Sequence, residues 1–180
     1  FANASLDDYL YKFNQVPSYS NYGTVGLIQM PTARMMPAGS LAISWSHSEP
    51  YLTGSVLAYP FSWFEASYQY TDINNAFYSD VALYSGSQSY KDKGFDVKFN
   101  IFRESPFIPE ISVGIRDIAG TAVFGSEYIV FSKKIFSNFD LTFGLGWGNL
   151  NGNPIKNPLK YLDKRFEARA ARDGGTQGGE

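Results

Sequence analysis

The chain has 180 residues, of which 44% are hydrophobic, 17% aromatic and only 18% charged, and it contains no cysteine. The lack of cysteine excludes disulfide scaffolds, zinc–thiolate sites and thiol catalysis. A formal net charge of -2 gives no electrostatic basis for binding nucleic acid. No apolar run is long enough for a transmembrane helix, whereas the many aromatic residues and glycines favour short strands.

Hydrophobic and polar residues alternate strictly along several segments of the chain. From Phe139 to Trp147, one face reads Phe, Leu, Phe, Leu, Trp and the other reads Asp, Thr, Gly, Gly. Because successive side chains of a strand point to opposite faces, this alternation predicts β-strands. Alternation of this kind gives seven candidate strands: 41–46, 51–59, 64–70, 94–102, 111–116, 127–134 and 139–147. Thr24–Met30 is a candidate eighth strand.

The connections between the candidate strands differ in length in an ordered way. Pro60–Ser62, Arg103–Pro109 and Ser137–Asn138 are short, whereas Asp72–Lys93 and the segment that starts at Gly148 are long and polar. In an up-and-down sheet these short connections lie at one end and the two longest at the other. Short turns at one rim and long loops at the other are typical of outer-membrane barrels, and the strand lengths suit a tilted membrane-spanning strand.

Alternation alone does not separate a membrane barrel from a soluble barrel or sandwich whose apolar face points inward. The face opposite the apolar one is mostly Ser, Gly, Thr, Ala, Asn and Gln, whereas a water-facing surface would be rich in Lys and Glu. Aromatic residues also gather near the strand ends, with Tyr59 and Trp63 in one expected girdle and Phe124 and Trp147 in the other. The sequence therefore predicts an all-β, antiparallel up-and-down transmembrane β-barrel with a short helix near the C-terminus.

The C-terminal part of the chain has a different character. Asn157 followed by Pro158 is typical of a helix start, and apolar residues then recur at helical spacing. We predict a short amphipathic helix over about 158–171 that caps the barrel rim, plugs the lumen or binds a partner. The chain would then divide into an N-terminal periplasmic entrance segment (1–38), the barrel strands (39–150), and a polar loop with this helix and a Gly-rich tail (151–180).

No motif for catalysis, nucleotide binding or metal binding stands out. The single histidine, His47, lies at a strand end, and Gly144–Gly148 lies within the clearest strand rather than opening a helix. Glu65, Asp96 and Asp140 share a face of different strands, where scattered lumen charges are favoured over a catalytic pair. We therefore expect no enzyme activity, no metal and no cofactor.

Several runs of the sequence resemble a known family over nearly the whole chain. The most specific is Gly23–Met35, which follows Ser5–Tyr9 and Phe13–Gly23. The similarity continues through Trp63–Ser67, Lys93–Phe99, Val113–Asp117, Gly125–Tyr128 and Gly144–Gly148. These runs resemble the YjbH-type exopolysaccharide-biosynthesis outer-membrane proteins.

The resemblance implies an outer-membrane β-barrel of Gram-negative bacteria that serves the export or surface assembly of an exopolysaccharide or capsule. Members of that family are several times longer than this chain, which would form the N-terminal part of a first barrel. The implied partners are outer-membrane lipid, polysaccharide and other polysaccharide-secretion proteins. The residues expected to line the lumen and contact hydrated sugars are Glu65, Gln69, Asp96, Lys98, Asn100, Arg116 and Asp140.

Two other functions are compatible with the sequence. The protein could be a structural outer-membrane anchor or assembly subunit that transports nothing, or a soluble carbohydrate-binding β-sandwich. Seven or eight strands close only the smallest barrel, whose interior fills with side chains, so a conduit would need strands beyond this chain.

Overall fold

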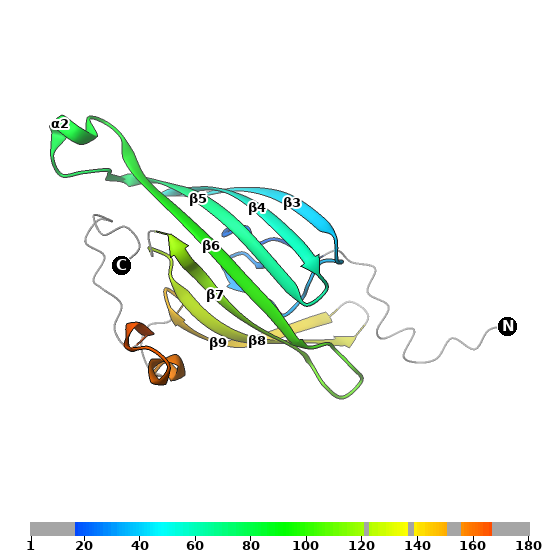
Figure 1. Ribbon diagram of the computed structural model, residues 1–180. Helices are drawn as coiled ribbons and strands as arrows, with labels where there is room; N and C mark the ends of the chain where they lie inside the picture. The colour runs from blue at the N-terminus through cyan, green and yellow to red at the C-terminus, as the bar shows by residue number, and fades with distance from the viewer. Residues whose placement is uncertain (1–16, 121–122, 137–138, 151–155, 167–180) are drawn as a thin grey trace.

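The computed structural model describes residues 17–120, 123–136, 139–150 and 156–166. Seven strands form one antiparallel sheet in chain order, curled into a half-barrel (Figure 1). Among the described residues, the outer edges of the first and last strand pair with no other strand. The strands are β3 (Ser40–Ser48), β4 (Tyr51–Phe61), β5 (Phe64–Phe77), β6 (Ser89–Phe102), β7 (Glu110–Gly120), β8 (Ser126–Phe136) and β9 (Phe139–Gly148).

All seven predicted strands of the sheet are present, but the candidate eighth is wrong. Within Thr24–Met30 the chain turns back on itself, and the residues on either side of the turn form a separate two-stranded pair, β1 (Gly26–Leu27) and β2 (Met30–Pro31). Ile28 lies in the turn with a positive φ of 46°. A left-handed residue reverses the chain, so the alternation around it does not extend into a barrel strand.

The predicted long loop over Asp72–Lys93 is largely strand. β5 and β6 stay paired from Asp72–Lys91 to Phe77–Ser89, and beyond Ile73, which still pairs with Tyr51 of β4, they run past the rest of the sheet. The hairpin ends in residues 78–88, which contain a single helical turn, α2 (Ala82–Ser85), and it protrudes from the sheet (Figure 1). The buried face of this stretch mixes Thr71 and Asp92 with Ile73 and Tyr90, and its other face is polar, so the strands left no apolar periodicity to recognise.

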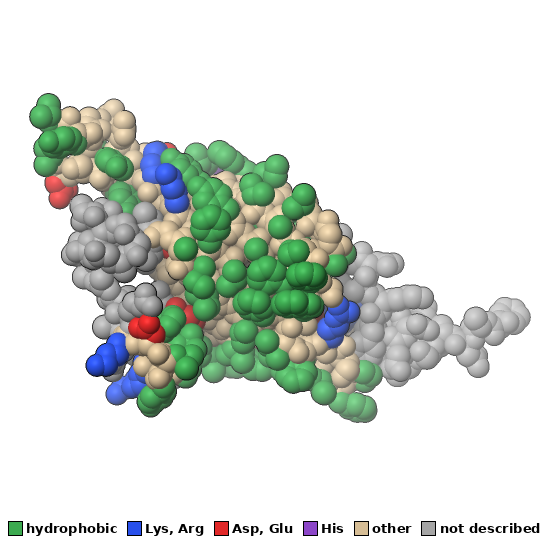
Figure 2. All heavy atoms as spheres, viewed as in Figure 1, with side chains coloured by type: hydrophobic (Ala, Val, Ile, Leu, Met, Phe, Trp, Pro, Cys, Tyr) green, Lys and Arg blue, Asp and Glu red, His purple; other side chains and the backbone are tan. Residues whose placement is uncertain are grey.

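The two faces of the curled sheet have opposite polarity. Apolar side chains cover much of the convex face, and charged side chains lie toward its ends (Figure 2). Ile43, for example, is 84% exposed although it lies in the middle of β3. A β-sandwich would bury this face against a second sheet. The large convex side chains are Leu41, Ile43, Trp45, Val56, Tyr68, Tyr70, Phe95, Phe99, Ile101, Leu141, Phe143 and Leu145.

Aromatic rings gather at the end of the sheet that carries the β4–β5, β6–β7 and β8–β9 turns, here called the short-turn rim. Trp63 stacks on Phe61 with ring centroids 5.2 Å apart and on Phe99 at 6.3 Å. Two residues expected in the girdles are elsewhere, because Tyr59 and Phe124 are buried inside the half-barrel. They belong to small apolar clusters on the concave side, where they pack against other inward-facing residues.

Residues 17–38, here called the N-terminal segment, lie along the concave face of the sheet (Figure 1). Val25 packs with Leu57 and Tyr59 of β4, and Ala33 packs with Tyr128 and Val130 of β8. The segment therefore fills the inner side of the half-barrel. Residues 1–16 of the predicted entrance segment (1–38) lie outside the described residues, and its periplasmic position stays a prediction.

The described part of the C-terminal region contains two short 3-10 helices, η1 (Pro158–Tyr161) and η2 (Lys164–Phe166). The predicted helix start is confirmed, because the Asn157 side chain accepts a hydrogen bond from the Leu159 N–H at 3.0 Å. A continuous amphipathic α-helix is wrong for the described residues, since η1 ends at Tyr161 and η2 is a separate 3-10 helix. Residues 167–171 of the predicted helix lie outside the described residues. Tyr161 and Leu162 are exposed, so this part does not fill the lumen. Within the described ranges, no helix is both long and apolar enough to cross a membrane.

Candidate lumen site

The polar side chains of the concave face come from the inward-facing positions of successive strands. All seven residues predicted to face the lumen lie on this side of the sheet. Glu65, Gln69, Asp96, Lys98, Asn100 and Arg116 are buried, whereas Asp140 lies at the short-turn rim and stays partly exposed. The structure thus gathers the predicted set, but beneath the N-terminal segment rather than in an open channel.

Lys98 and Glu65 form an ion pair at the centre of the concave face. The two side chains are each 1% exposed, and Lys98 Nζ lies 3.1 Å from Glu65 Oε2. The same ammonium group donates to the backbone oxygen of Arg34 at 3.0 Å and, at 3.4 and 3.5 Å, to those of Val25 and Thr32. A buried charge is tolerated only when a partner and hydrogen bonds compensate its lost hydration. Lys98 therefore joins the sheet to the N-terminal segment.

Asp96 stabilises an irregularity in the sheet. The register between β6 and β7 shifts between Phe95 and Val97, and Asp117 opposite has a positive φ of 53°. A bulge removes backbone groups from the ladder, and Asp96 Oδ1 accepts the Asp117 N–H at 2.8 Å in compensation. Gln69 Nε2 approaches the same oxygen at 3.5 Å. The bulge thus explains why a carboxylate is held at this position.

Arg116 is held by aromatic rings rather than by carboxylates. Its guanidinium carbon lies 4.4 Å from the ring centroid of Tyr22 and 5.8 Å from that of Tyr128. Among the described residues, its Nε and Nη2 atoms have no hydrogen-bond acceptor. A desolvated cation over an aromatic face is attracted by the ring quadrupole. Arg116 therefore couples β7 to the N-terminal segment through Tyr22.

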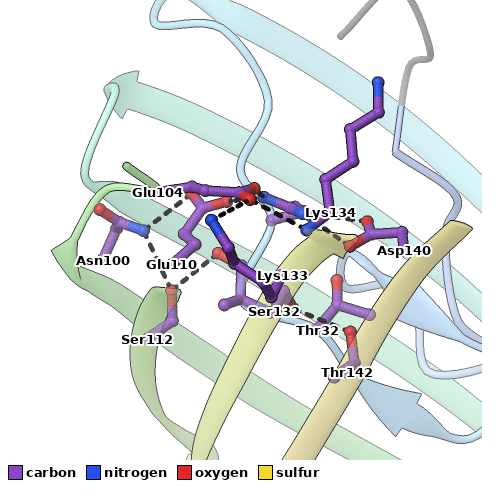
Figure 3. A network of polar contacts seen from close by, with 12 residues as sticks. Thr32, Asn100, Glu104, Glu110, Ser112, Ser132, Lys133, Lys134, Asp140 and Thr142 are labelled. Carbon is purple, nitrogen blue, oxygen red and sulfur yellow. Dashed lines mark hydrogen bonds and ion pairs between the residues drawn. The ribbon is translucent and has the colours of Figure 1, made fainter. Parts of the chain in front are cut away.

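A second polar cluster lies at the short-turn rim (Figure 3) and is here called the Arg34 cluster. Arg34 binds both carboxylate oxygens of Asp140, at 2.9 and 2.6 Å, and also Glu104 at 2.6 Å and Glu110 at 2.7 Å. Lys133 lies 3.1 Å from Glu104. Bidentate guanidinium–carboxylate pairs have defined geometry, so the cluster places Arg34 firmly on strands β7 and β9 and the β6–β7 loop.

Serine hydroxyls bind the backbone of the segment next to Arg34. Ser112 Oγ donates to the Ala33 carbonyl at 2.8 Å, and Ser132 Oγ accepts the Ala33 N–H at 2.9 Å. Asn100 supports this contact by donating to Ser112 Oγ at 3.3 Å and to Glu110 at 2.9 Å. Side chains of the sheet thus supply hydrogen-bond partners to the backbone N–H and carbonyl of Ala33, which lies outside the strands.

The Arg34 cluster lowers the pKa of Glu104, the carboxylate in the β6–β7 loop. Burial works to raise the pKa of Glu104, but hydrogen bonds from Arg34, from the Lys134 N–H and from Lys133 outweigh it, so that its pKa is lowered below the ordinary value of 4.5. The pKa of Arg34 is raised, because its carboxylate partners outweigh the effect of burial. Both groups are therefore charged at neutral pH.

Part of this site was not predicted from the sequence. Glu110 and Ser112 share the inward parity of β7, so alternation could have identified them. Arg34 and Glu104 lie outside the regular strands of the sheet, where no periodicity shows which way a side chain points. Among the described residues, no group of three or more His, Asp or Glu side chains is arranged to hold a metal ion.

These features define a curled β-sheet wall with an apolar outer face and a charged inner face that its own N-terminal segment covers. Residues 18–180 match the YjbH family, described as "Exopolysaccharide biosynthesis protein YbjH", and the chain belongs to this family. The resemblance seen in the sequence is thereby confirmed.

A curated relative carries the same family name. The chain is 42% identical over 167 residues to "Uncharacterized lipoprotein YjbH" of Escherichia coli (strain K12), an alignment that covers 88% of this chain and 24% of the relative. The chain thus spans about a quarter of the length of that relative. No solved structure matches the chain.

Proposed function

We propose that this chain forms part of the wall of an outer-membrane β-barrel that lines a conduit for exopolysaccharide or capsule. The inverted polarity of the sheet is the observation that carries the proposal. Exposing large apolar side chains such as Ile43 and Trp45 to water is unfavourable, whereas against hydrocarbon the same side chains are stable. The description of the family, which names exopolysaccharide biosynthesis, supports this choice of polymer.

The convex and concave faces of the sheet would contact different partners. Lipid would contact the convex face, and the aromatic rings of the short-turn rim would lie at the membrane interface. The serine, amide and charged groups of the concave face would exchange hydrogen bonds with a hydrated sugar chain. Further polysaccharide-secretion proteins would bind at the loops. In this proposal the chain performs no catalysis and needs no cofactor.

A structural role is the second candidate, and one observation favours it. The N-terminal segment covers the concave face, as expected if the barrel anchors an export or assembly machine and passes nothing. Both candidates place the protein in the bacterial outer membrane. They differ in whether the interior opens.

Two measurements test the proposal. The full-length protein should stay with the membrane fraction after a carbonate wash, and its release into the aqueous phase would contradict a barrel. In planar bilayers the full-length protein should carry ionic current. A stable membrane protein without current in any state would favour the structural role over the conduit.

A further inference from the structure

The N-terminal segment is attached to the sheet without being part of it. Among the described residues, its strand pairing is confined to β1 and β2, which form a separate sheet. Its contacts with the barrel wall use side chains of the sheet, such as Ser46 Oγ to the Asn21 carbonyl at 2.5 Å and Ser55 Oγ to the Tyr22 carbonyl at 3.3 Å. The segment can therefore leave without breaking a ladder of the seven-stranded sheet.

The attachment combines apolar and polar contacts. Val25, Pro31 and Ala33 are buried, and Tyr19, Tyr22 and Met36 pack partly buried against the apolar clusters. The other contacts are hydrogen bonds and ion pairs, which water or a polar ligand can replace. The polar part of the attachment is thus of a kind that can be exchanged.

We infer that the N-terminal segment is a displaceable plug that occupies the polysaccharide site of the concave face, with Arg34 as its latch. This inference rests on the proposed conduit function. Carbonyl oxygens of the segment accept from Lys98 and Ser112, and the hydroxyl and ring oxygens of a sugar chain can accept from the same groups. The plug and the polymer therefore compete for one set of donors.

Arg34 is assigned as the latch because its contacts are charged and lie at the rim. Its guanidinium neutralises the converging carboxylates of Glu104, Glu110 and Asp140. When Arg34 leaves, these carboxylates face one another with less compensating positive charge, which opposes opening. Asp140 is the most exposed of the three, at 33%, so water reaches the latch from the short-turn rim.

Displacement of the plug can be measured without measuring transport. The 180 residues contain no cysteine, so Ser132→Cys introduces one thiol into them, at a position that the segment buries. In the full-length protein with any cysteine outside these residues replaced by serine, a water-soluble maleimide should label this thiol about tenfold faster or more when Arg34→Ala is added. Arg34→Lys, which keeps the charge but loses the bidentate pair, should give an intermediate rate and guards against misfolding of the alanine variant.

A matched control uses an ion pair that does not touch the segment. Lys91 of β6 pairs with Asp72 of β5, and Lys91→Ala should leave the labelling rate unchanged. Equal labelling rates for Arg34→Ala, Lys91→Ala and the parent would overturn the latch.

A reducible cross-link then connects displacement to conduction. Ala33→Cys combined with Ser132→Cys brings two thiols close together, since the Ala33 N–H lies 2.9 Å from Ser132 Oγ, and a short bifunctional thiol reagent should join them through bonds that reduction cleaves. We expect the bilayer current of the full-length protein to fall about tenfold on cross-linking and to return on reduction, while each single-cysteine variant is unaffected. Failure of the two thiols to cross-link would contradict the placement of the segment.

The outcomes separate the plug from the conduit. A current that is the same in the cross-linked and reduced forms would overturn the plug and leave the conduit standing. No current in any form would overturn the conduit. Slow labelling of Ser132→Cys that no Arg34 substitution accelerates would overturn Arg34 as the latch, whatever the current.

Discussion

The convex and concave faces of the sheet follow opposite rules of burial. Ile43 on the convex face is 84% exposed, whereas Glu65 and Lys98 on the concave face are each 1% exposed. In a water-soluble domain the apolar face would be covered and the charged face hydrated. The difference shows that this fold is not held together by a large apolar core.

What stabilises the sheet is instead its strand ladder and its polar interior. The buried apolar clusters are small, and each joins only a few residues. Charged and hydroxyl groups of the concave face bind one another and the N-terminal segment. Substitutions on the two faces should therefore change the free energy of unfolding for different reasons. The concave face should be sensitive to loss of an ion pair or hydrogen bond, and the convex face to an added charge.

The largest effect is expected on the concave face at Lys98. Lys98→Met leaves Glu65 buried without its partner and removes donors from the segment, which should cost about 3–5 kcal/mol in the free energy of unfolding. Urea unfolding of the full-length protein measures it. Adding Glu65→Leu should recover part of the loss, and a cost below about 1 kcal/mol for Lys98→Met alone would show that the pair is hydrated.

The convex face is tested by introducing a charge at mid-strand. Val56 is exposed on β4 between Ile43 and Tyr68 of the neighbouring strands. Val56→Arg should cost about 2–4 kcal/mol of unfolding free energy in lipid vesicles, and Phe107→Arg in the exposed β6–β7 turn about 0–1 kcal/mol. An equally small cost at both positions would show that water, not lipid, contacts this face.

Packing on the concave face is tested at Gly114. A Cβ atom there would lie 2.3 Å from the Tyr128 ring, which covers Gly114 from the neighbouring strand. Gly114→Ala should cost about 1–3 kcal/mol in unfolding free energy, because the ring must shift within a packed interior. The same substitution in a Tyr128→Leu background should cost less, whereas equal costs in the two backgrounds would mean that the ring moves freely.

The smallest effect is expected from protonation of Glu104. Its pKa is lowered in the folded state, so its ionisation stabilises the fold above the ordinary pKa of 4.5, and this contribution is lost as the pH falls through the folded pKa. Arg34, Lys133 and the Lys134 N–H supply the stabilisation. The unfolding free energy of Glu104→Gln should therefore fall less steeply below about pH 5 than that of the parent.

The control for this prediction is an exposed carboxylate. Glu49 contacts His47 at the end of β3, away from the Arg34 cluster. Glu49→Gln should leave the acid slope of the stability profile unchanged. A Glu104→Gln profile that runs parallel to that of the parent would exclude Glu104 as the source of the slope.

Much of the fold and part of the site could be read from the sequence. The strands of the sheet and the inward set from Glu65 to Arg116 follow from alternation, which is strong wherever a strand has one apolar and one polar face. The extensions of β5 and β6 lack that contrast, and the turn at Ile28 interrupts a run that looked extended. Tyr59 and Phe124 were misplaced because proximity to a strand end does not show which face a ring occupies.

By itself, the sequence determined an antiparallel β protein of the YjbH family with one apolar and one polar face, because a strand's facing pattern is a local property with a period of two residues. Only the tertiary structure decided what covers the polar face. The contacts of Arg34 with Asp140, and of Ala33 with Ser132, join residues that are far apart along the chain and lie outside any shared periodic element. Such pairings depend on how the sheet curls around the segment, and no local pattern records that curvature.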